Sequence, residues 1–170
     1  MFVLFRKFHN IRGNFQLNPF RTLGFQDVVE LDPLNYYATN ELILLGAKSA
    51  AELKTLLRGV PESHLELAMY YYNNGFASDA KAVLTTSEYV NPYPTVEYWL
   101  GYLADATGDK DAALAWFKKA EAGAIDYVFP FRLETIAVLN KALEYLPTSF
   151  NTWYYLGNIY YHKQPEVALA

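Results

Sequence analysis

The sequence predicts an all-α protein, built as a right-handed superhelical stack of antiparallel helix pairs. Three observations lead to this prediction. Apolar residues recur at helical spacing through most of the chain, glycine and proline interrupt them at short intervals, and one pattern of small and large apolar residues returns at a fixed offset. A single helix pair cannot bury its apolar face alone, so repeated pairs are expected to stack around one continuous core.

Residues 95 to 122 contain the clearest helix pair. Leu100 and Gly101 are adjacent in the first helix, and Ala104 follows one turn later. Gly108 ends that helix, and Asp109 is placed to cap the second. In the second helix, Ala113, Phe117 and Ala120 lie on one face. Small residues in this pattern let two antiparallel helices approach, and the larger ones fill the space between them.

Residues 61 to 88 repeat this pattern without a gap over their central part. Gly75 matches Gly108 at an offset of 33 residues. The same offset relates two further matched pairs, Ala80 with Ala113 and Leu84 with Phe117. The prolines at positions 92 and 94 then exclude helix and form the connection to the next pair.

A more degenerate pair is predicted over residues 32 to 58. Asp32 and Pro33 are expected to start its first helix, Gly46 ends that helix, and Ser49 can cap the second. Leucines are predicted to form the buried faces, with Leu42, Leu44 and Leu45 in the first helix and Leu53, Leu56 and Leu57 in the second.

After Ala120 the repeat pattern becomes longer and less regular. Residues 124 to 146 are predicted as a pair whose first helix is short or irregular and whose second begins near Phe131 and ends before Pro147. The predicted buried stripe of the second helix is Ile136, Leu139, Leu143 and Leu146.

Residues 148 to 170 are predicted as a last, incomplete pair, capped by Thr148 or Ser149. Four of its residues follow the spacing W-x-x-L-G-x-x-Y, namely Trp153, Leu156, Gly157 and Tyr160. A solenoid needs a polar capping helix at each end, and none is visible here. We therefore expect the chain to belong to a longer array or to associate with a second copy through its C-terminal end.

Residues 1 to 26 are predicted to be a non-repeat N-terminal extension that precedes a helical repeat domain over residues 27 to 170. The charged residues of the extension are all basic, and they are Arg6, Lys7, Arg12 and Arg21. They interrupt the apolar core that a signal peptide needs. The extension is expected to dock on the first repeat or to be the remnant of a preceding segment, and a functional basic arm is the other interpretation.

The composition argues against several classes of partner. A net charge of −4 gives no broad electrostatic reason to bind nucleic acid or an anionic membrane, and no apolar run is long enough to span a bilayer. The chain contains no cysteine, which fits a reducing compartment. A cytoplasmic location is favoured, although exported bacterial proteins can also lack cysteine.

The repeats over residues 61 to 122 and 148 to 164 resemble the tetratricopeptide (TPR) repeat family. Phrases such as LDPLNYYATNELILLG, FPFRLETIAVLNKALEYLP and NTWYYLGNIYYHKQ are similar to the C-terminal TPR region of large bacterial proteins. Those proteins carry an uncharacterised N-terminal β-sandwich domain linked to carbohydrate metabolism. The resemblance implies an accessory helical array, with no catalytic residue to carry over to this chain, which lacks the β-sandwich.

No enzymatic, cofactor-binding or metal-binding motif is found in the sequence. It contains no phosphate-binding loop, no G-x-S-x-G and no H-E-x-x-H, and the histidines His9, His64 and His162 lie far apart. The acidic pairs Glu62 with Glu66 and Asp105 with Asp109 are typical of a solvated helix face or a helix cap. We therefore expect a protein that is not an enzyme and that binds no cofactor and no metal.

A binding groove is predicted on the concave face, which the first helix of each pair lines in TPR stacks. The exposed positions i, i+4 and i+7 of those helices give a Tyr-rich set without Lys or Arg. Its members are Leu65, Met69, Tyr72, Tyr98, Tyr102, Asp105, Tyr154, Asn158 and Tyr161. Such a groove suits a peptide with apolar anchors or a stacked sugar ring, whereas the same tyrosines could also simply pack against the neighbouring repeat.

The predicted function is that of a non-catalytic scaffold that binds a protein or peptide partner, or another domain of a longer parent chain, through this groove. The alternative is a structural accessory segment of a larger carbohydrate-active bacterial enzyme. A third possibility is self-association through the C-terminal end.

Overall fold

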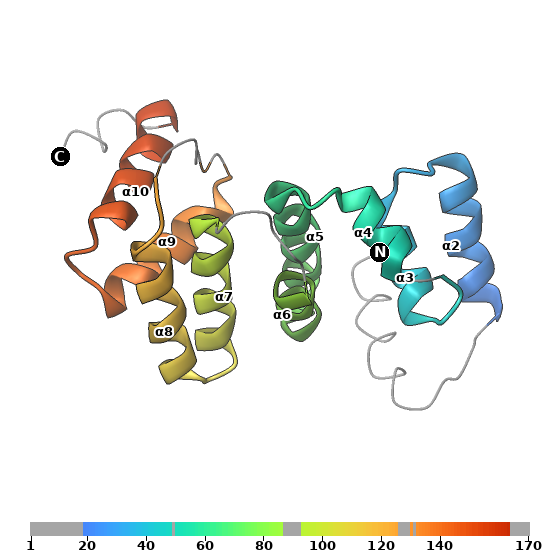
Figure 1. Ribbon diagram of the computed structural model, residues 1–170, viewed down its shortest axis with the longest axis horizontal. Coiled ribbons are helices and arrows are strands. Elements are labelled where there is room, and N and C mark those ends of the chain that lie inside the picture. The colour runs from blue at the N-terminus through green and yellow to red at the C-terminus, as the bar shows by residue number, and fades with distance from the viewer. Residues whose placement is uncertain (1–18, 49, 87–92, 126–129, 131, 164–170) are drawn as a thin grey trace.

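The computed structural model describes residues 19–48, 50–86, 93–125, 130 and 132–163 (Figure 1). Every regular element within these ranges is an α-helix, which confirms the all-α class. The helices are α2 (Pro19–Leu31), α3 (Tyr36–Leu44), α4 (Ala50–Leu57), α5 (Pro61–Asn73), α6 (Ala77–Thr86), α7 (Pro94–Ala106), α8 (Lys110–Glu121), α9 (Glu134–Tyr145) and α10 (Phe150–Lys163). Most of the predicted N-terminal extension, the predicted cap Ser49 and the C-terminal residues 164–170 lie outside the described residues.

Most consecutive helices pack against each other along an elongated body (Figure 1). Helices α5 and α6 occupy the predicted pair 61–88, and α7 and α8 occupy the pair 95–122. The most extensive contact is between α7 and α8, and α6 also contacts α7. Helices α2, α3 and α4 form one end of the body, and α9 and α10 pack at the other end. None of the described helices is both long enough and apolar enough to cross a membrane.

Glycine turns and polar caps set the helix ends in the middle of the chain. Gly75 and Gly108, which follow α5 and α7, both have a φ of +84°, a conformation that glycine adopts without the steric cost of a side chain. The Asp109 carboxylate accepts a hydrogen bond of 3.0 Å from the backbone N–H of Ala112 and so caps α8. Both glycine turns and this cap are confirmed predictions.

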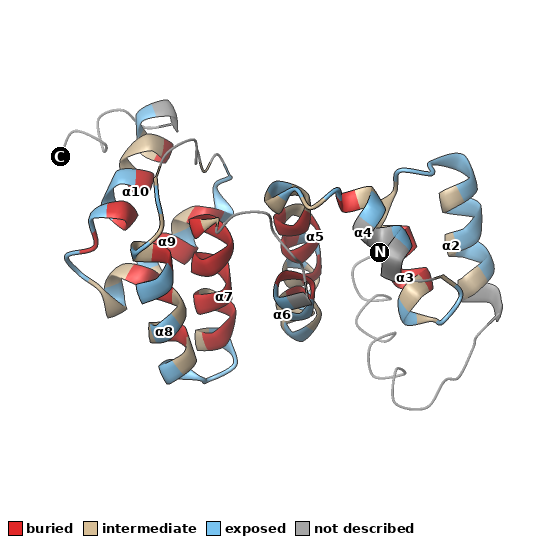
Figure 2. Cartoon of the chain, in the orientation of Figure 1, coloured by how far each residue is buried: buried red, intermediate tan, exposed pale blue. Residues whose placement is uncertain are grey.

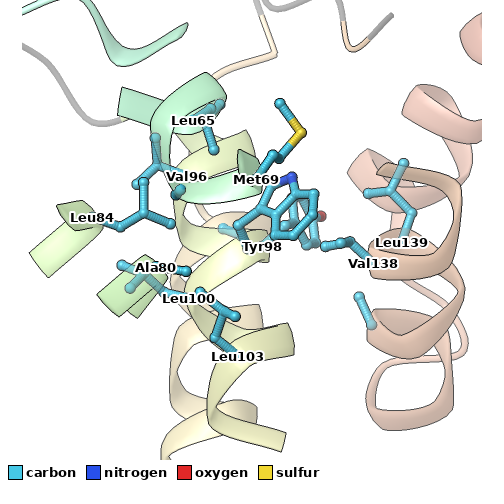
Figure 3. Packing of buried hydrophobic residues seen from close by; sticks show 14 of the residues in the cluster. Leu65, Met69, Ala80, Leu84, Val96, Tyr98, Leu100, Leu103, Val138 and Leu139 are labelled. Carbon is cyan, nitrogen blue, oxygen red and sulfur yellow. The ribbon is translucent and has the colours of Figure 1, made fainter. Parts of the chain in front are cut away.

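The core runs continuously from Leu57 at the end of α4 through α10 (Figure 2). In α7 and α8, the predicted buried residues Ala104, Ala113, Phe117 and Ala120 are fully inaccessible to solvent. Figure 3 shows Ala80 and Leu84 of α6 beside Val96 and Leu100 of α7. The repeated small and large residues therefore pack as the sequence pattern predicts.

Helix α3 differs from its prediction in both its start and its buried face. It begins at Tyr36 instead of near Pro33, because the Asn35 side chain caps it through the Ala38 N–H at 2.9 Å. Leu42 is buried, but Leu44 is 53% exposed, so its predicted burial is wrong. Polar residues take part in the buried face instead, and they are Thr39, Asn40 and Glu41.

A hydrogen-bond network joins α3 to α5. The hydroxyl of Tyr71 donates to a Glu41 carboxylate oxygen at 3.0 Å and accepts a hydrogen bond from the Asn40 side chain. The Tyr71 side chain is completely buried. Burial, followed by the nearby Glu41 charge, raises the pKa of Tyr71 far above its usual value. Asn40 and Glu41 can be buried here because each has a hydrogen-bond partner in α5.

Helix α9 begins at Glu134, and the described residues between α8 and α9 form no helix. Its buried face consists of Thr135, Val138, Leu139 and Ala142, whereas the predicted residues Ile136, Leu143 and Leu146 are only partly buried. Figure 3 shows Val138 on the side of α9 that is turned toward the core around Tyr98 and Met69. The difference arises because α9 packs across α7, which selects a face slightly rotated from the predicted stripe.

Helix α10 is tied to α8 through polar groups at its first turn. The Ser149 hydroxyl accepts a hydrogen bond of 3.2 Å from the Thr152 N–H, as a helix cap does. The Glu121 carboxylate of α8 accepts from the Phe150 N–H at 3.0 Å and from the Ser149 hydroxyl. Leu156 is buried, but Trp153, the first residue of the W-x-x-L-G-x-x-Y match, is 57% exposed.

Candidate functional site

The nine residues predicted for the groove occupy three different environments. Leu65, Met69 and Tyr98 are buried, whereas Tyr154 and Tyr161 of α10 are exposed. The other four are partly buried, and they are Tyr72, Tyr102, Asp105 and Asn158.

Part of this set joins α5, α7 and α9. The Tyr72 and Tyr102 hydroxyls are 2.9 Å apart, within hydrogen-bond distance, and both rings pack edge-on against Trp99. Burial and the hydrogen bond to Tyr102 raise the pKa of Tyr72 to about 12. Asp105 accepts a hydrogen bond from the Tyr145 hydroxyl of α9. These side chains therefore hold neighbouring helices together.

Tyr98 lies inside the junction of α7, α8 and α10. Its hydroxyl accepts a hydrogen bond of 2.9 Å from Thr152 and lies 3.4 Å from a Glu121 carboxylate oxygen. Its ring packs against Tyr155 and Phe117. The side chain has no solvent-accessible surface, so its contacts are with the protein itself.

An open cleft of about 510 Å³ lies beside one of the predicted residues, Met69. Residues of α3, the turn before it, α5 and the segment that leads into α9 line this cleft. They are Asp32, Leu34, Asn35, Tyr36, Tyr37, Glu66, Met69, Tyr70, Asn73, Arg132 and Glu134. The cleft is large enough for several side chains of a partner, and it is the candidate functional site of the described residues.

Tyrosines supply the aromatic surface of the cleft. The ring centroids of Tyr37 and Tyr70 are 4.1 Å apart, with the ring planes inclined at 46°. Tyr70 is 38% exposed, which leaves part of its surface accessible from the cleft. Burial and the negative charge of Glu66 raise the pKa of Tyr36, and the positive charge of Arg132 partly opposes that rise. The Tyr36 hydroxyl is therefore protonated at neutral pH and can act as a hydrogen-bond donor.

An ion pair closes one side of the cleft. The guanidinium of Arg132, just before α9, pairs with the Glu66 carboxylate of α5 across 66 positions of the sequence. Both side chains remain partly exposed, and ion pairs of this kind contribute little to stability.

A second, smaller recess of about 30 Å³ adjoins the cleft and shares Glu66, Met69 and Arg132 with it. Trp99 also lines this recess and is buried. Its indole N–H has no hydrogen-bond partner among the described residues.

The sequence pattern did not point to the tyrosines of this cleft. Tyr36 and Tyr37 are adjacent in α3, and Tyr70, Tyr71 and Tyr72 are consecutive in α5. Consecutive residues of a helix point in directions about 100° apart, so a run of large aromatic side chains cannot all face the core. Such runs are the signal that could have located the cleft.

The described residues contain no group of three His, Asp or Glu side chains that could hold a metal ion.

Comparison of the chain with protein-family models, with curated proteins and with solved structures finds no match.

Proposed function

We propose that the chain is a non-catalytic, TPR-like scaffold that binds an extended segment of a partner protein in the Tyr-rich cleft between α3 and α5. The observation that carries the proposal is the open cleft of about 510 Å³, which combines exposed tyrosine surface with a partly exposed ion pair. Tyrosine contributes a rigid apolar face and a hydroxyl at small entropic cost, and such residues dominate the affinity of many interfaces.

The packing of α5 to α8 supports the TPR-like part of the proposal. The two helix pairs share a 33-residue offset, glycine turns of equal φ, and small residues at the helix crossing. Helix α6 also contacts α7, as the second helix of one repeat contacts the first helix of the next. We propose that these pairs belong to a right-handed superhelical solenoid.

Binding can be tested with an array of immobilised mixed-sequence peptides of about ten residues each. The affinity of the best peptides would then be measured by fluorescence anisotropy for the native chain, for Tyr70→Ala and for Tyr161→Ala. Tyr161 is a matched control because it is 64% exposed on α10, away from the cleft. We expect Tyr70→Ala to weaken binding about tenfold or more and Tyr161→Ala to leave it unchanged.

Two results would contradict the proposal. If no peptide binds the native chain, the scaffold function is wrong. If Tyr161→Ala weakens binding and Tyr70→Ala does not, the binding surface lies on α10 instead of in the cleft. Far-ultraviolet circular dichroism of both variants shows whether their helical content is unchanged.

A further inference from the structure

The residues that line the cleft carry an excess of negative charge. Three carboxylates, those of Asp32, Glu66 and Glu134, share the cleft with one guanidinium, that of Arg132. Arg132 is paired with Glu66, so these two charges balance each other. No further positive charge among the residues that line the cleft balances the carboxylates of Asp32 and Glu134.

These two remaining carboxylates are both able to attract a cation. Asp32 accepts hydrogen bonds from the Leu34 N–H at 3.2 Å and from the Asn35 side chain at 3.3 Å. Both donors are neutral, so they orient the carboxylate at the edge of the cleft without cancelling its charge. Glu134 is exposed in the first turn of α9 and has no hydrogen bond or ion pair with another described residue.

The aromatic surface of the cleft suits the same kind of group. A Lys or Arg cation is attracted to the face of a tyrosine ring when it lies within about 6 Å of the ring centroid. Tyr70 offers exposed ring surface, and the neighbouring Tyr37 ring holds it in place. The aliphatic stem of Lys or Arg would also cover apolar surface at Met69 and Leu34, which line the same cleft.

We propose that the partner segment bound by this cleft is cationic: a Lys or Arg side chain lies against the Tyr70 ring, and Asp32 and Glu134 balance its charge. This inference rests on the proposed function, because it specifies the chemistry of the partner bound there. An acidic segment would instead meet two unbalanced carboxylates, and its binding would be opposed by like-charge repulsion.

The experiment uses peptides of about ten residues that share the same apolar residues and differ only in carrying Lys, Gln or Glu at matched positions. Their affinities would be measured for the native chain, for Asp32→Asn and Glu134→Gln, and for the double variant. Asp111→Asn is the control, because Asp111 is an exposed acid in the first turn of α8, away from the cleft, and its replacement changes the net charge equally.

We expect the Lys peptide to bind most tightly to the native chain. Each cleft variant should weaken its binding about two- to fivefold and the double variant about tenfold, whereas Asp111→Asn should have no effect. Raising the salt concentration from about 50 to about 200 mM should weaken the native complex more than that of the double variant.

The other outcomes distinguish failure of this inference from failure of the proposed function. If the three peptides bind equally well, the cleft binds peptides without charge selection, so this inference is wrong and the proposed function stands. The inference is also wrong if Asp111→Asn weakens binding as much as the cleft variants, because the effect then comes from overall charge. If none of the peptides binds, the proposed function itself fails.

Discussion

The backbone of Gly101 in α7 lies so close to the Phe117 ring of α8 that a Cβ atom built on the glycine would be 2.5 Å from Cε1 of that ring. No real Cβ tolerates such a contact, so either the ring or the helix would have to move. The α7–α8 pair therefore depends on a glycine in the middle of a helix, where glycine is otherwise unfavourable.

Replacement of Gly101 by alanine should lower the free energy of unfolding by about 1–3 kcal/mol, because the overpacking exceeds the gain in helix propensity. Urea unfolding followed by circular dichroism measures the change. Gly157→Ala in α10 is the matched control, since a Cβ built there meets no atom within 4 Å apart from its chain neighbours and the adjacent backbone of its own helix. That variant should be neutral or stabilised by up to about 1 kcal/mol. Equal destabilisation of both variants would contradict the close-packing explanation.

Removal of the Tyr71 hydroxyl should weaken the attachment of α3 to α5. Tyr71→Phe takes away a hydrogen-bond partner of both Asn40 and Glu41, which stay buried. The expected loss is about 1–3 kcal/mol of unfolding free energy, measured by urea unfolding. Tyr70→Phe, one residue earlier and partly exposed, should change stability by less than about 0.5 kcal/mol. If the two variants are equally stable, the Tyr71 network adds nothing to the fold.

The Glu121 carboxylate should hold the start of α10 against α8. Glu121→Ala removes the acceptor for the Phe150 N–H and for the Ser149 hydroxyl, and we expect a loss of about 1–2 kcal/mol. Hydrogen exchange should become faster for the first turn of α10 and stay unchanged in α5. As a control, Glu144→Ala removes an exposed carboxylate that pairs with Lys141 on the surface, and it should have little effect. Uniformly faster exchange throughout the chain would instead indicate global destabilisation.

The buried histidine of α5 should make stability depend on pH. Burial lowers the pKa of His64, and its Nδ1 atom lies 2.8 Å from the Val60 carbonyl oxygen. The unfolded chain, with a histidine pKa near 6.5, binds the proton first as the pH falls. The unfolding free energy should therefore decrease as the pH falls below about 6.5, until His64 also protonates in the folded state.

This pH dependence can be measured by urea unfolding at pH values from about 7.5 down to 5.5, alongside a nuclear magnetic resonance titration of the His64 ring. His64→Asn, which keeps a side-chain donor for the Val60 carbonyl, should show a flatter dependence. A His64 pKa at or above 6.5 in the folded chain would contradict the prediction.

Local sequence signals predicted the helical pairs in the middle of the chain because each of those signals acts over a few residues. Gly75 and Gly108 provide the positive φ values, Asp109 caps α8, and Phe117 recurs at the position of Leu84. Backbone sterics and capping hydrogen bonds do not depend on the rest of the fold, so their positions can be read from the sequence.

Helical spacing was less informative where helices meet in an irregular way. It predicted burial of Leu44, but that residue is exposed, and the buried face of α3 includes Asn40 and Glu41. The Tyr71 hydroxyl, 30 and more positions away in the sequence, helps to stabilise these polar residues in the interior. The partner of a buried polar group cannot be identified from the group's own helix.

The sequence by itself determined the all-α class, the glycine turns after α5 and α7, and the Asp109 cap, since these follow from the conformational preferences of neighbouring residues. Only the tertiary structure decided that Tyr98 is enclosed by α10 and that the cleft joins Tyr36, Tyr70 and Arg132. Helical periodicity states which residues share a face, but the packing of distant helices decides whether that face is covered. The candidate site was therefore set by long-range contacts between α3, α5 and the start of α9.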